Sequence, residues 1–198
     1  MRMLVMLFAL TSFMACNSNS VPEKSEPGKT VVVKSISLND STINVVSSLF
    51  DQYESLKNGL VDYNIPAVDS SATFLSSILN KFSISGIQDA ALTDSIHYSI
   101  KNMEASVNAI LAKGSIEDKK RSFSQLSESF YLFLTRIQFD QFTLYKQTCP
   151  MAFNDNESAS WISRSTEIYN PYLGKKHPKY AAGMLNCGEV SDSVSFKK

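Results

Sequence analysis

The chain has 198 residues, of which 19 are basic and 19 acidic, so its formal net charge at pH 7 is zero. It has no stripe of Lys and Arg with interleaved aromatics, which excludes nucleic acid as an expected partner. It has two histidines and lacks a Gly-rich phosphate loop, a Gly-x-Ser-x-Gly sequence and a His-Glu-x-x-His sequence. We therefore expect a protein that is not an enzyme.

Residues 1–16 predict export and a lipid anchor. Arg2 supplies a positive start, residues 4–15 are mostly apolar, and a small residue precedes Cys16, as in a secretory signal. The apolar run is too short to span a bilayer as a helix. A cysteine at the cleavage point can be acylated, so we expect Cys16 to carry lipid and the protein to face the periplasm. A plain signal peptide with a chance cysteine is the alternative.

Four amphipathic segments follow a tether. Residues 17–39 are rich in Ser, Pro, Glu and Lys, a composition typical of flexible linkers. Apolar residues then recur at three- and four-residue steps over about residues 40–64, 69–82, 88–112 and 115–146, as on one helix face. Pro66 is expected to end the first helix and Ser115 to cap the fourth. This pattern predicts an all-α fold, with an antiparallel four-helix bundle over residues 40–147.

Residues 148–198 form the last predicted region, which is rich in Asn, Ser, Pro, Gly and Tyr and shows little periodicity. Cys149-Pro150 is expected to stop the fourth helix. We predict an irregular C-terminal arm that carries a short helix near residues 159–168. Such an arm cannot bury itself, so we expect it to pack on the bundle, with Trp161, the single tryptophan, as its anchor.

Two cysteines remain once Cys16 is set aside as the lipidated residue, and one interpretation is a disulfide. Cys149 and Cys187 would pair in an oxidising compartment, as cysteines of exported proteins commonly do. On a chain-entropy model such a bridge stabilises by about 3–4 kcal/mol, because it closes a loop of several tens of residues.

The other interpretation is a soft-metal site. Each cysteine has a methionine nearby, Met151 beside Cys149 and Met184 beside Cys187, and thiolate and thioether sulfurs select Cu(I) over hard cations. His177 is a weaker candidate for an imidazole ligand. A thiol pair that binds metal only when reduced, and forms a disulfide when oxidised, combines both interpretations.

Four sequence blocks in this arm resemble a known signature. They are Cys-Pro-Met-Ala at 149–152, Ala-Ser-Trp-Ile-Ser at 159–163, Ile-Tyr-Asn-Pro-Tyr-Leu-Gly at 168–174 and Met-Leu-Asn-Cys-Gly-Glu-Val at 184–190. Over roughly residues 42–191 the chain is similar to an exported helical family known as domain of unknown function 3347, typically from Bacteroidetes-type bacteria. The same domain is fused to copper/silver efflux membrane-fusion adaptors. The resemblance thus implies Cu(I) or Ag(I) as cargo and a heavy-metal efflux adaptor as partner.

Three functions remain open from the sequence. The first is a lipid-anchored protein that binds Cu(I) or Ag(I) through Cys/Met ligands in the arm. The second is a non-metal structural or protein-binding module with a Cys149–Cys187 disulfide. The third is a small organic ligand held by the aromatic side chains of the arm, namely Trp161, Tyr169, Tyr172 and Tyr180. In the first, the residues expected to shape the arm are Trp161, Asn170, Pro171, Tyr172 and Gly174.

Overall fold

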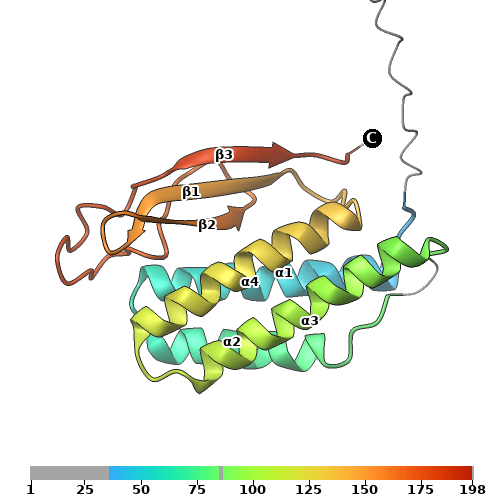
Figure 1. The fold of residues 1–198 in the computed structure, drawn as a ribbon, viewed down its shortest axis with the longest axis horizontal. Helices are drawn as coiled ribbons and strands as arrows, with labels where there is room; N and C mark the ends of the chain where they lie inside the picture. Colours follow the sequence, from blue (N-terminus) through green and yellow to red (C-terminus); the bar gives the residue numbers. More distant parts are fainter. Residues whose placement is uncertain (1–35, 85–86, 198) are drawn as a thin grey trace, which may run out of the picture. The chain divides into compact units, whose positions relative to one another are not determined.

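The computed structural model describes residues 36–84 and 87–197, and these contain a layer of helices and a small sheet. The helices are α1 (Asp40–Val61), α2 (Ile65–Leu79), α3 (Ala90–Ala112) and α4 (Ile116–Arg136), and the strands are β1 (Leu144–Phe153), β2 (Glu157–Ser163) and β3 (Glu189–Val194). The sheet lies along α1 and α4, and α2 and α3 form the opposite side (Figure 1). The predicted signal segment with Cys16, and most of the predicted tether, lie outside the described residues. Among the described helices, none is both long and apolar enough to cross a membrane.

The four helices begin at polar side chains that accept a hydrogen bond from the backbone of their first turn. These caps are Asn39, Asn64, Asp89 and Ser115. The predicted start of the fourth helix at Ser115 is therefore confirmed. Pro66 has a different place from the one expected, because α1 already ends at Val61 and the proline lies in the first turn of α2. A missing N–H costs nothing in a first turn, so α2 begins earlier than predicted.

The all-α prediction is wrong, because a three-stranded antiparallel sheet follows the helices. The fourth helix does not reach residue 146. It ends at Arg136, and Gln138 then has a φ of 51°, a left-handed conformation that turns the chain out of the helix. Ile137 and Leu144 are spaced like neighbours on a helix face, yet they belong to different elements. Apolar spacing alone did not distinguish the two cases.

The short helix expected near residues 159–168 is also wrong, since β2 occupies the first half of that segment and no helix follows in the rest. Trp161 and Ile162 are adjacent and both fully buried, on opposite faces of the strand. A strand that is buried on both faces lacks the alternation of apolar and polar residues that marks a strand in a sequence. Trp161, expected to anchor the arm on the bundle, is fully buried, but its ring lies against Tyr172 and Gly188 of the C-terminal region.

The sheet has the order β2-β1-β3, with β1 in the centre and both pairings antiparallel. Thr148 of β1 pairs with Ser160 of β2 and with Glu189 of β3. Asn154 and Asp155 turn the chain between β1 and β2 with φ values of 52° and 64°. These are residue types that tolerate left-handed backbone at low cost, so the turn is encoded locally.

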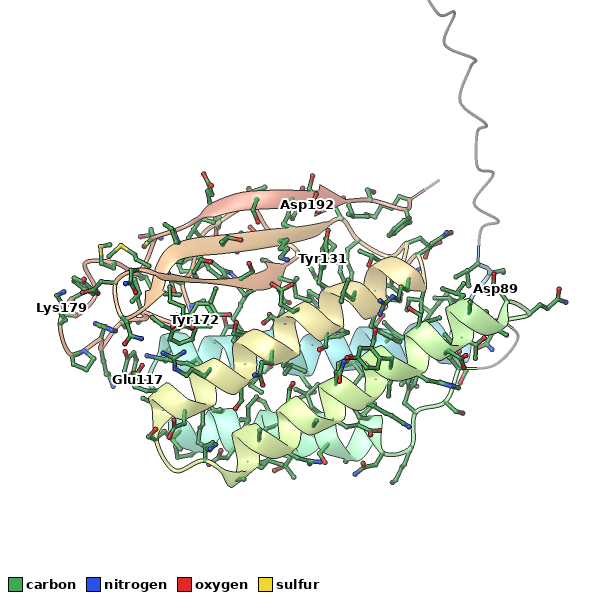
Figure 2. The ribbon with its side chains drawn as sticks, in the orientation of Figure 1. Asp89, Glu117, Tyr131, Tyr172, Lys179 and Asp192 are labelled. Carbon is green, nitrogen blue, oxygen red and sulfur yellow. The ribbon has the colours of Figure 1, made fainter. Side chains whose placement is uncertain are left out.

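One face of the sheet contacts the helices. Lys146 of β1 forms an ion pair of 2.8 Å with Glu128 of α4, and Tyr131 of α4 donates a hydrogen bond to Asp192 of β3 (Figure 2). Because side chains alternate along a strand, Gln147 and Cys149 point to the other face of the sheet. There the amide of Gln147 donates to the backbone oxygens of residues 165 and 167. We call residues 164–188, which include these two acceptors, the covering segment.

The core between helices and sheet is rich in aromatic side chains. Phe50 and Tyr53 of α1 pack against Phe130 of α4, with ring centroids 5.7 and 5.5 Å apart. The Tyr53 hydroxyl is satisfied inside this core, because it bonds to the Ser127 hydroxyl at 2.7 Å and accepts from the backbone N–H of Ile162 at 3.1 Å. The same residue thus joins α1, α4 and the outer edge of β2.

Candidate functional site: the thiol pair

Cys149 lies on the central strand of the sheet and is completely buried. Its partner across the β1–β2 pairing is Ala159, a small residue that leaves room on the outer face of the sheet. The preceding residue, Thr148, is paired on both sides, with Ser160 of β2 and Glu189 of β3. The backbone of Cys149 is therefore held by β2 and by the doubly paired residue before it.

Cys187 reaches the same place from the end of the covering segment. Its N–H donates to the carbonyl of Met184 at 3.0 Å, which closes a tight turn. Gly188 follows with a φ of 135°, and a Cβ there would lie 2.9 Å from the carbonyl oxygen of Thr148 and 3.0 Å from the Trp161 ring. Only glycine fits this approach to β1. As a result the Sγ atoms of Cys149 and Cys187 are 2.9 Å apart.

Asn170 holds the turn of Cys187 in place. It is fully buried, and its Nδ2 donates to the carbonyl of Cys187 at 2.7 Å. Its Oδ1 accepts from the backbone N–H groups of Tyr172 and Leu173 at 2.8 and 3.0 Å. One side chain therefore satisfies both a bend in the covering segment and the backbone beside the thiol. The expected role of this asparagine in shaping the arm has a clear physical basis.

The other residues predicted to shape the arm attach it to the rest of the protein. Tyr172 is buried, and its hydroxyl donates to the backbone oxygen of Ser160 on β2. The buried Pro171 precedes it in the bend that Asn170 closes. Gly174 has a φ of 56°, and a Cβ there would lie 2.8 Å from the backbone oxygen of Val61 in α1. This block therefore joins the sheet to the end of α1.

Gln147 is a residue of this region that the sequence analysis missed. Its Nε2 bonds to two carbonyls of the covering segment, at 2.9 and 3.0 Å, which fixes the orientation of the amide. Its Oε1 and the Nε1 of its cross-strand partner Trp161 are buried without a hydrogen-bond partner among the described atoms. Once β1 is known to be a strand, the two-residue spacing of Gln147 and Cys149 places both on one face. The helical interpretation of this segment hid that signal.

The other candidate ligands are Met151, Met184 and His177. Met151 and Met184 are half-buried and pack against the hydrophobic core. His177 stacks on Tyr180 with ring centroids 5.1 Å apart. It lines a cavity of about 370 Å³ together with Glu117 and other residues near the β1–β2 turn. Within residues 36–84 and 87–197, no three His, Cys, Asp or Glu side chains are grouped as a metal site.

The aromatic residues proposed for an organic ligand do not share one surface. Trp161 and Tyr172 are almost fully buried, whereas Tyr169 is 47% exposed. Tyr180 bonds instead to Asp155 in the turn between β1 and β2, close to the labelled Lys179 (Figure 2). The geometry therefore gives no support to a single aromatic platform.

Burial shifts the pKa values of Cys187 and His177. It raises the pKa of the Cys187 thiol to about 12, and contact with Cys149 adds to that rise. It also lowers the pKa of His177, with a further contribution from the positive charge of Lys120. At neutral pH the reduced Cys187 is therefore a thiol, and binding of a metal ion there must displace its proton.

Fold and site together define a small α/β protein in which two cysteine sulfurs meet at the covered face of the sheet. Residues 49–141 match the family described as Protein of unknown function (DUF3347), so this part of the chain belongs to the family that the sequence predicted. The match begins within α1, covers α2, α3 and α4 and ends before β1, although the four sequence blocks behind the prediction lie beyond residue 148. No curated protein and no solved structure matches the chain.

Proposed function

We propose that this protein is a lipid-anchored, extracytoplasmic binding protein rather than an enzyme. Its thiol pair, Cys149 and Cys187, binds a soft metal ion, Cu(I) or Ag(I), in the reduced state and forms a disulfide when oxidised. The observation that carries the proposal is the contact of the two sulfurs, which come from distant positions in the chain and lie 2.9 Å apart. Two convergent thiolates are donors that favour soft monovalent ions.

The surroundings of the pair support a switch between an open and a closed form. An ion placed between the two sulfurs must push them apart, because a metal–sulfur bond is about 2.3 Å long. Cys149 is held by the sheet, so Cys187 and its turn are the part that moves. Met151 and Met184 are the thioethers nearest in sequence, and we propose them as additional ligands. A heavy-metal efflux adaptor is the proposed partner, on the basis of the resemblance alone.

A titration tests the metal role. The full chain with Cys16→Ala, which leaves two thiols, is reduced and titrated with Cu(I) against a competing chelator. We expect one equivalent of tight binding, which disappears in the matched variant that also carries Cys149→Ala and Cys187→Ala. Met151→Leu and Met184→Leu should each weaken binding without abolishing it. Equal Cu(I) affinity of the cysteine-free variant and of the protein with both thiols would contradict the proposed metal binding.

A permanent disulfide in a structural or protein-binding module is the second candidate. The observation that favours it is the 2.9 Å separation, which is shorter than the spacing a shared ion requires, together with the complete burial of Cys149. The same protein, purified without reductant and alkylated, distinguishes the two by intact mass. A pair that resists mild reductant identifies the permanent bridge, and free thiols that copper protects from alkylation identify the metal site.

A further inference from the structure

The two cysteines of the pair differ in their access to solvent. Cys149 is fully buried on the central strand, and Cys187 is half-buried in the turn before β3. We infer that Cys187 is the thiol that first meets an external reactant, and that Cys149 is the second thiol, which completes the reaction from the covered side. This inference rests on the proposed function, because it concerns a pair that opens and closes.

The position of Cys149 argues against direct attack from solvent. β2 pairs with it at Ala159, and on its face of the sheet the covering segment contacts it through the Cys187 sulfur and contacts the nearby Gln147. Trp161 is on the same face and is itself fully buried, and it packs against the position of Gly188. A disulfide or a hydrated ion cannot reach this sulfur unless the covering segment moves.

The position of Cys187 favours first contact. Its two anchoring hydrogen bonds both involve its backbone: its N–H donates to Met184 and its carbonyl accepts from Asn170. The side chain is therefore left outside this anchoring network, and its neighbour Asn186 is exposed. A turn of this kind can present the sulfur to a reactant and then return it to Cys149.

The exchange with an external disulfide shows how the two roles differ. The Cys187 thiol loses its proton and attacks one sulfur of the external disulfide, whose S–S bond breaks and releases a first thiolate. The mixed disulfide on Cys187 is then attacked by deprotonated Cys149, and the second external thiolate leaves. In sum, the pair loses two electrons and two protons, and the external disulfide becomes two thiols.

Oxidised glutathione is the probe for the test. The reduced full chain with Cys16→Ala is exposed to it briefly, quenched with acid and mapped by peptide mass. The matched variants add Cys149→Ala, which removes the second thiol, or Cys187→Ala, which removes the first. We expect the adduct of the Cys149→Ala protein to accumulate on Cys187. The adduct on Cys149 of the Cys187→Ala protein should form at least about tenfold more slowly, because a buried thiol is inert.

An adduct found first on Cys149 of the protein with both thiols would overturn the inference, and so would equal rates in the two single variants. Mapping of the protein with both thiols decides the matter if Cys187→Ala perturbs the fold. Absence of any adduct on Cys187 also overturns it. The outcome is independent of the copper titration, since a pair can react in this order without binding metal and can bind metal without this order.

Discussion

The helical layer and the C-terminal sheet region are stabilised by different kinds of contact. In the helical layer the buried residues are mainly apolar, and buried serines such as Ser106 and Ser127 bond to the backbone of their own helix. In the sheet region the buried Gln147 bonds across the chain to the covering segment, and the buried Asn170 joins two parts of that segment by its bond to the Cys187 carbonyl. A packed apolar layer tolerates many sequences, whereas a network of side chain to backbone bonds demands particular residues.

This difference explains why the two regions carry different sequence signals. The helices follow from spacing, and many side chains satisfy the same spacing. The covering segment depends on single atoms: a donor for the carbonyl of Cys187, an acceptor for the N–H of Tyr172, and room for the backbone at Gly188. The region with the thiol pair therefore has distinctive short motifs without regular periodicity.

The largest expected effect is in the helical layer. Phe130→Ala removes a fully buried ring between α1 and α4, and we expect a loss of about 3–5 kcal/mol in the free energy of unfolding. Urea denaturation followed by circular dichroism measures it. The matched control is Phe74→Ala, because that ring is 57% exposed and its loss should change stability by about 0.5 kcal/mol or less. Similar losses in both variants would remove the basis for treating this layer as the packed core.

A smaller but more local effect is expected in the sheet region. Asn170→Ala leaves a carbonyl at Cys187 and two backbone N–H groups unpaired, and we expect a loss of about 2–4 kcal/mol. Hydrogen exchange should localise the loosening to the covering segment and leave α2 and α3 protected. Asn186→Ala is the control, since this exposed residue makes one bond, to the carbonyl of Ile168 at 2.6 Å. Loosening spread evenly over the helices would contradict the separation of the two regions.

The sequence predicted the four helices and missed the sheet. Polar caps and apolar spacing are local signals, so α1 and α3 were predicted close to their observed bounds and the start of α4 at Ser115 was correct, whereas the end of α4 and the start of α2 were not. The strands β1 and β2 were taken for helix or irregular arm. The helices cover one face of the sheet and the covering segment contacts the other, and such burial is a property of the assembled fold.

For the same reason, only part of the candidate site could be predicted from the sequence. Counting cysteines was enough to pair Cys149 with Cys187, and the structure brings their sulfurs together. It could not separate the buried thiol from the accessible one, because that difference depends on the covering segment. His177 was grouped with the thiols by sequence, whereas the structure places it with Glu117 near the turn between β1 and β2.

The smallest expected effect is the pH dependence of stability that the Cys187 thiol contributes. In the reduced protein burial raises the pKa of Cys187 from 9.0 to about 12, so the folded state holds this proton more tightly than the unfolded state does. The resulting stability is fully present below pH 9 and is lost as pH rises from 9 towards 12. Cys187→Ala lacks this contribution. The melting temperature of the reduced protein, relative to that of this variant, should therefore fall as the pH is raised above 9.

Taking the difference between the two proteins cancels the titration of the lysines and tyrosines that they share. The oxidised protein provides a second control, since a disulfide has no thiol proton to lose and its melting temperature should lack this component of the pH dependence. A difference between reduced protein and variant that stays constant from pH 8 to about 10.5 would mean that Cys187 is as solvated in the folded state as in the unfolded chain. The covering segment would then not shield Cys187, and the partial burial of this thiol would have to be given up, which would leave Cys149 as the only buried member of the pair.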